Sequence, residues 1–177
     1  MKKLEILATI VVIMGLLVYN VPITTQIDMT VDGVKRSVGD INYQEAVVVK
    51  VQGKLRRYLI KDDCFDGIIS ISGDDEYMYD SKKDIYGKLV LDKNTSILSM
   101  ISNLEFDTYG DFICNDDFSK FVFLVLDDGS WTADDGLYIV APATNTIDMV
   151  TTLEIIEDDL EHDWNEAFIE TIYKTLD

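Results

Sequence analysis

The chain has 177 residues, 33 acidic and 15 basic, so its formal net charge is −18, and 47% of its residues are hydrophobic. This length suits one domain, and the apolar content excludes disorder caused by the lack of a core. The negative charge argues against nucleic-acid binding through the body of the protein, because such binding needs cations that displace phosphate counterions. We therefore expect a folded acidic domain.

The N-terminal segment has the pattern of a membrane anchor. An apolar run from Ile6 to Tyr19 follows two lysines, and residues 4–23 come close to the ~20 apolar positions that a spanning helix needs. A secretory signal would need small residues at its cleavage site, and residues 18–22 provide none. We expect an uncleaved signal-anchor over residues 1–23. A buried core helix is the alternative, because a run of ~10–14 apolar residues is equally common there.

Basic residues around this segment predict its orientation. Lys2 and Lys3 precede the apolar run, whereas the next basic residues, Lys35 and Arg36, come well after it. Because basic residues concentrate on the cytoplasmic side, we expect a single-pass protein of the cell membrane with its N-terminus inside. Residues 24–177 would then form an acidic domain outside the cytoplasm.

The domain itself begins with a series of strand patterns. Residues 25–31 alternate strictly between polar and apolar side chains, and Asp32-Gly33 offers a turn after them. A second hairpin is predicted around Gln52-Gly53-Lys54. The further runs typical of strands are residues 46–51, 55–60, 65–71, 85–91, 97–104, 121–126 and 137–141. Residues 121–126 have no polar side, so this strand should be central and covered on both faces.

After Pro142, which ends the last strand, the apolar period becomes helical. Ile147, Val150 and Leu153 recur at helical spacing, and a second apolar stripe runs from Trp164 to Ile172. Strands first and helices last predict an α+β fold, a mainly antiparallel sheet with two C-terminal helices packed on one face.

The side chains that most enzymes use are scarce. His162 is the one histidine, Cys64 and Cys114 are the two cysteines, and no glycine-rich phosphate-binding motif occurs. These residues do not supply a four-ligand zinc site or a Cys-x-x-Cys pair. We therefore predict that the protein is not an enzyme and holds no cofactor or metal. The two cysteines are either buried thiols or, outside the cytoplasm, a disulfide.

Residues 127–136 place four carboxylates, two hydroxyls and a tryptophan within ten positions. Calcium would suit the oxygen ligands, but the EF-hand order is not met, so an acidic hairpin loop is the favoured interpretation. An exposed tryptophan here would be a common type of partner anchor, unless it folds back over the sheet. The candidate partner-binding residues are Asp127, Asp128, Trp131, Asp134 and Asp135.

Short motifs also suggest a relationship. Residues 65–71 (Phe-Asp-Gly-Ile-Ile-Ser-Ile), and Gly136 followed by the run from Ile139 to Asn145, resemble small membrane-anchored extracytoplasmic proteins of Gram-positive bacteria that have no assigned activity. The resemblance covers the body from Val47 onward. It implies the same compartment as the anchor and no catalytic residue.

Together these features predict a non-catalytic, membrane-anchored binding or accessory module of the cell envelope. Its partner would be a protein with a basic surface, because a negative field attracts cationic surfaces. The alternative is an acidic immunity or inhibitor protein that neutralises a basic toxin or enzyme. Catalysis would require two distant aspartates to converge, as in glycoside hydrolysis.

Overall fold

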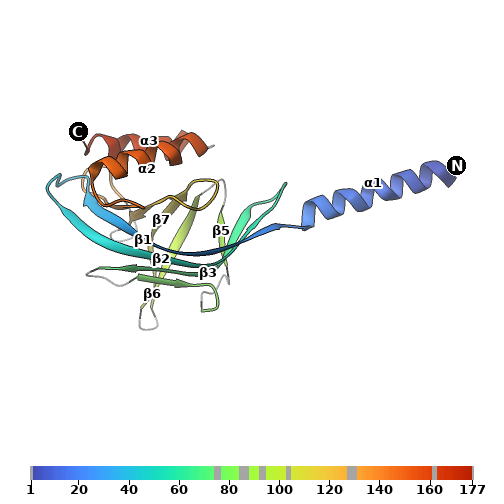
Figure 1. Ribbon diagram of the computed structural model, residues 1–177, viewed down its shortest axis with the longest axis horizontal. Helices are drawn as coiled ribbons and strands as arrows, with labels where there is room; N and C mark the ends of the chain where they lie inside the picture. Colours follow the sequence, from blue (N-terminus) through green and yellow to red (C-terminus); the bar gives the residue numbers. More distant parts are fainter. Residues whose placement is uncertain are drawn as a thin grey trace.

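A computed structural model describes residues 2–73, 77–83, 88–91, 95–102, 105–126, 131–160 and 163–176. In these residues one helix precedes a curled sheet, and two helices follow it (Figure 1). The helices are α1 (Lys2–Asn20), α2 (Thr146–Asp159) and α3 (Asp163–Tyr173). The strands are β1 (Ile23–Ser37), β2 (Gln44–Arg57), β3 (Asp63–Ser72), β4 (Tyr77–Asp80), β5 (Leu89–Leu91), β6 (Thr95–Ser102), β7 (Glu105–Cys114), β8 (Phe121–Val125) and β9 (Leu137–Ala141).

All described strands belong to one antiparallel sheet. Its order is β4-β3-β2-β1-β9-β8-β7-β6, and β5 pairs with β3 beside β4. The sheet curls into a half-barrel, so that β6 at one edge contacts β4 and β5 at the other. The α+β class fits this mixed secondary structure.

The concave side of the sheet encloses a core, called here the inner core. Val49 and Val51 of β2 face it opposite Ile71 and Ile69 of β3. Its phenylalanines are Phe65, Phe112, Phe118, Phe121 and Phe123, whose neighbouring rings lie with centroids 5.0–5.7 Å apart. Such pairs add to the burial of apolar area that holds the two halves of the curled sheet together.

Helices α2 and α3 cover the other face of β8 and β9 and form a second core, the outer core (Figure 1). Leu153 and Ile156 of α2 and Ile172 of α3 are fully buried there against sheet residues such as Tyr138. Strand β8 is therefore buried on both faces, which confirms the prediction of a central strand over residues 121–126.

Two predicted turns are wrong, because glycines that suggested turns lie inside long strands. Strand β1 continues through Asp32-Gly33, and β2 continues through Gly53. A Cβ at Gly33 would lie 3.1–3.2 Å from atoms of β2 and β9, so this glycine permits close approach of neighbouring strands. Gly53 faces Gly67 in the register, and the Phe65 ring lies over both. This arrangement permits the bend of the sheet.

The prediction of a transmembrane helix is wrong. In the part of the chain that the structure describes, no helix combines the length and the apolar character needed to cross a membrane. The apolar run from Ile6 to Tyr19 has 14 residues, short of the ~20 that span a bilayer, and Glu5 lies in the first turn of α1. The signal-anchor over residues 1–23 and the single-pass topology with an outside domain are corrected with it. Membrane contact through residues 4–23 stays a prediction.

Candidate functional site

The predicted partner-binding loop is only partly exposed where the structure describes it. Trp131 folds back over the protein: its indole Nε1 donates a hydrogen bond to the Leu137 carbonyl at 2.9 Å. Its ring meets Phe168 edge-on, with centroids 5.2 Å apart. A Cβ at Gly136 would overlap the indole. Trp131 therefore packs on the outer core and is not an exposed partner anchor. Asp127 and Asp128 lie outside the described residues.

The two remaining aspartates of the loop, Asp134 and Asp135, are exposed. A carboxylate oxygen of Asp135 accepts a hydrogen bond from the Thr132 hydroxyl, and the Asp135 amide donates to the same hydroxyl at 3.2 Å. The Ser37 hydroxyl donates to the Asp135 carbonyl at 3.4 Å. The loop is thus a closed turn that rests on the end of β1 and carries two carboxylates on its surface.

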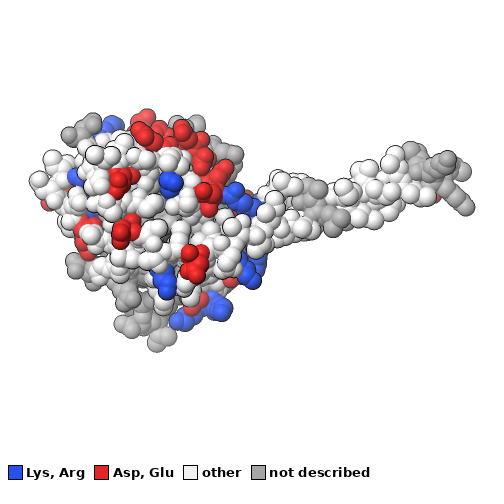
Figure 2. All heavy atoms as spheres, in the orientation of Figure 1, with Lys and Arg blue, Asp and Glu red and all other residues white. Residues whose placement is uncertain are grey.

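The acidic side chains of this protein are unevenly distributed along the chain. Residues 94–177 contain 19 acidic and two basic side chains, whereas residues 1–93 contain 14 acidic and 13 basic ones. In the view of Figure 2 the acidic side chains gather over the helices, and basic ones gather toward α1 and the lower side of the sheet. The surface therefore has two electrostatically different regions.

Helix α2 carries part of the exposed acidic region. Ile147, Thr151, Glu154 and Asp158, at spacings of three and four residues, are all exposed. On a helix this spacing forms one row, called here the α2 row. All ion pairs among the described residues lie within residues 35–83. Glu154 and Asp158 therefore pair with no described cation.

The acidic field of α2 acts on a neighbouring tyrosine. The Tyr173 hydroxyl of α3 donates a hydrogen bond to Glu157 at 3.4 Å. Burial, together with the negative charges of Glu157, Glu154 and Asp158, raises the pKa of Tyr173 to about 12. Deprotonation would add a further negative charge there, so the field holds the phenol neutral.

One surface depression, of about 440 Å³, lies between β1 and the start of α2. Two carboxylates, Asp32 and Asp148, line it. Asp148 accepts hydrogen bonds from the Thr144 hydroxyl at 2.6 Å, the Thr144 amide at 3.0 Å and the Asn145 side-chain amide at 2.9 Å. The bonds from Thr144 hold the pKa of Asp148 below its usual value. Asn145 is the N-cap of α2, and its side-chain oxygen accepts from the Asp148 amide at 3.1 Å. The hydrogen-bonding capacity of the Asp148 carboxylate is thus largely used at the start of the helix.

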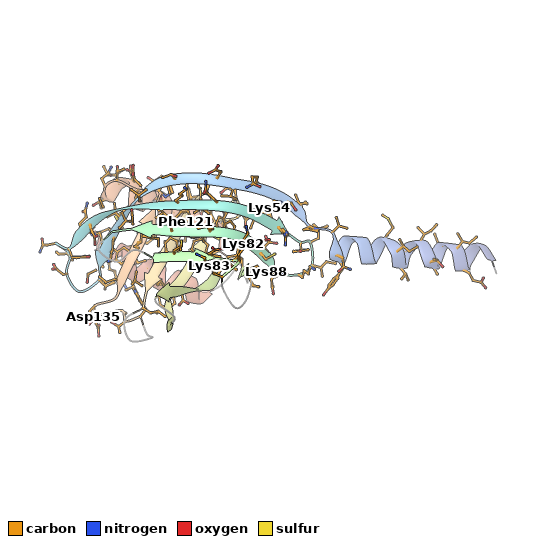
Figure 3. All side chains as sticks on the ribbon, turned by 90° about the horizontal axis from the view of Figure 1, so that it is seen from below. Lys54, Lys82, Lys83, Lys88, Phe121 and Asp135 are labelled. Atoms are coloured by element: carbon orange, nitrogen blue, oxygen red, sulfur yellow. The ribbon has the colours of Figure 1, made fainter. Side chains whose placement is uncertain are left out.

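A second depression, of about 420 Å³, lies on the outer face of β2 and β3 and is called here the basic groove. Lys54, Arg56 and Lys82 line it, together with Asp66 and Asp80. The Arg56 guanidinium pairs with Asp66 at 2.9 Å, and Lys83 pairs with Asp80 at 3.8 Å. Lys54 and Lys82 form no ion pair with a described residue. Lys54, Lys82, Lys83 and Lys88 lie in the half of the sheet nearer α1 (Figure 3).

Glycoside hydrolysis would need two facing carboxyl groups, one of them with a raised pKa. Burial raises the pKa of Asp111, but its partners in the register are Ile97 and Leu124. Among the described residues, no three His, Cys, Asp or Glu side chains converge as a metal site. Cys64 and Cys114 are buried and not joined by a disulfide. His162 lies outside the described residues.

Sequence reasoning missed both the α2 row and the basic groove. The uneven division of charge between the two halves of the chain was a usable signal, and so was the helical spacing of Thr151, Glu154 and Asp158. The groove had no such signal, because residues far apart along the chain, in β2, β3 and after β4, line it.

Comparison of the chain with protein-family models, with curated proteins and with solved structures finds no match. The resemblance based on residues 65–71 and 139–145 stays a prediction.

Proposed function

We propose that the protein is a non-catalytic binding module that holds a protein partner with a basic surface on the exposed side of α2. The observation that carries this proposal is the α2 row, in which two carboxylates without a described cationic partner share one side of the helix with an exposed isoleucine. In the proposed interface, cations of the partner pair with Glu154 and Asp158, and an apolar side chain of the partner covers Ile147.

Ile147 adds an apolar contribution to this surface. Its side chain is 78% exposed, more than that of any other large hydrophobic residue described. Covering such a side chain stabilises a complex by about 2 kcal/mol. The neighbouring charges would steer a cationic partner toward it and set its orientation.

The acidic loop at Asp134 and Asp135 is the competing location on the same molecule. It offers two exposed carboxylates, but its aromatic side chain, Trp131, is committed to the outer core. It therefore lacks the apolar contact that Ile147 gives α2. We infer that the loop contributes only to the general negative field.

Binding of a cationic probe separates the two locations. A fluorescent peptide of alternating lysine and leucine residues would be titrated into the wild-type chain, into Glu154→Gln/Asp158→Asn and into the matched control Asp134→Asn/Asp135→Asn, all at physiological salt. We expect affinity to fall at least tenfold for the α2 variant and less than twofold for the control. Equal losses would mean that only net charge matters, and a loss confined to the control would place the site at the loop.

A further inference from the structure

The outer face of β2 has an ordered sequence of exposed side chains. Because side chains alternate along a strand, Val48, Lys50, Gln52, Lys54 and Arg56 all point away from the inner core. This strand face has an apolar residue at one end, Val48, and is basic at Lys50, Lys54 and Arg56. On a chain with net charge −18, this is an unusual concentration of cations.

Neighbouring strands extend the apolar end of this face. Ser70 of β3 stands between Lys50 and Met78 in the register, and Ile68 stands opposite Gln52. Val48 is 41% exposed, and Ile68 and Met78 are each 39% exposed. These side chains give the groove an apolar border beside its lysines, as expected of a surface that contacts protein.

The α2 row has the complementary order. It begins with Ile147 and continues through Thr151 to Glu154 and Asp158. From Ile147 to Asp158 the helix rises ~17 Å at 1.5 Å per residue. From Val48 to Lys54 the strand rises ~20 Å at 3.3 Å per residue. An apolar end and a charged end therefore occur on both surfaces over nearly the same length, with opposite signs of charge.

We propose that the α2 row of one copy docks on the basic groove of a second copy, with Ile147 over the apolar border and Glu154 and Asp158 beside Lys54 and Lys82. The inference rests on the proposed function, because it names the groove as one basic surface that α2 binds. The cations at the groove without a described partner and the carboxylates on α2 without one would neutralise each other.

Within one copy the two surfaces cannot meet. Helix α2 covers β8 and β9, whereas the groove lies on β2 and β3, on the side of the curled sheet away from the helices (Figure 1). The contact is therefore heterologous, and such contacts build rings or open chains rather than two-fold dimers. Repulsion between the net charges does not prevent it at physiological salt, since it is screened beyond ~8 Å.

The test uses two charge-reversal variants of the full chain in sedimentation velocity. Lys54→Glu/Lys82→Glu reverses the charge of the basic groove. Ile147→Lys/Glu154→Lys removes the apolar side chain of the α2 row and reverses one of its charges. The control Lys120→Glu/Lys174→Glu reverses two lysines elsewhere. We expect wild type and control to form species larger than dimers as concentration rises, while each variant alone stays a monomer. An equimolar mixture of the two variants has one intact interface, so it should form dimers and nothing larger.

Several outcomes would overturn the inference. If both variants self-associate like wild type, the contact lies elsewhere, for example at the exposed side chains of α1. If wild type stays a monomer, or if the mixture does not form dimers, the groove is not the partner of α2. Titration of the same samples with the lysine-leucine peptide shows whether the proposed function fails too: a monomeric wild type that still binds the peptide through α2 refutes only the self-association.

Discussion

Removing the Phe121 ring should destabilise the protein by about 4 kcal/mol, the middle of the range for a buried phenylalanine replaced by alanine. The side chain is fully buried on β8, and its ring contacts those of Phe112 and Phe123 at centroid distances of 5.7 and 5.4 Å. Each aromatic pair accounts for about 1 kcal/mol of this loss. The rest comes from lost apolar burial and the cavity left behind.

Equilibrium unfolding in urea, followed by circular dichroism, measures this loss. Because about 4 kcal/mol is a large part of the stability of a small domain, Phe121→Leu serves as a second variant and should cost about 1 to 2 kcal/mol. Ile147→Ala is the control on an exposed site and should change the free energy of unfolding by less than about 0.5 kcal/mol. A loss below about 1 kcal/mol for Phe121→Ala would refute the closed inner core.

Three further predictions concern protonation and backbone packing. Burial raises the pKa of the Cys114 thiol above its ordinary value of 9.0, so above that pH the folded state keeps this proton while the unfolded state loses it. The free energy of unfolding should therefore fall above pH ~9 by up to about 1.4 kcal/mol per pH unit. Urea titrations at several pH values measure this fall, and Cys114→Ala should lack it. Glu157→Gln should lower the pKa of Tyr173 from about 12 toward its ordinary value of 10.0, since it removes a negative charge and keeps a hydrogen-bond acceptor. Carbon NMR of labelled tyrosine measures the pKa, and an unchanged value would refute the electrostatic cause. Gly53→Val should cost more than about 2 kcal/mol in urea unfolding, because its side chain would collide with the Phe65 ring, and a neutral effect would contradict the close contact.

The periodicity of the sequence predicted most elements because it reflects which face of each segment is buried. Residues 25–31 alternate as a strand does and lie in β1. The stripe from Ile147 to Leu153 has the period of a helix, and Leu153 is buried in α2, although Ile147 is exposed. It misled at glycines. The sequences around Gly33 and Gly53 are typical of turns, yet both glycines lie inside strands. A glycine also permits close approach of a neighbouring strand or ring.

The candidate site was less predictable than the fold. The loop at Trp131, Asp134 and Asp135 attracted attention through its composition, but the direction of the indole depends on Phe168 and Leu137. The segment from Ile6 to Tyr19 was predicted to cross a membrane on its apolar run, and no described helix meets the length and apolar character that this requires.

By itself the sequence determined the acidity of the protein, the order of strands before helices and the central position of β8, since these follow from composition and from patterns between near neighbours. Only the tertiary structure decided that the long strands curl around one core and that Lys54 and Lys82 line one groove. It also decided that Trp131 is turned inward and that Ile147 is left exposed. These features depend on contacts between residues distant along the chain, and local patterns do not encode which distant residue will cover a given side chain.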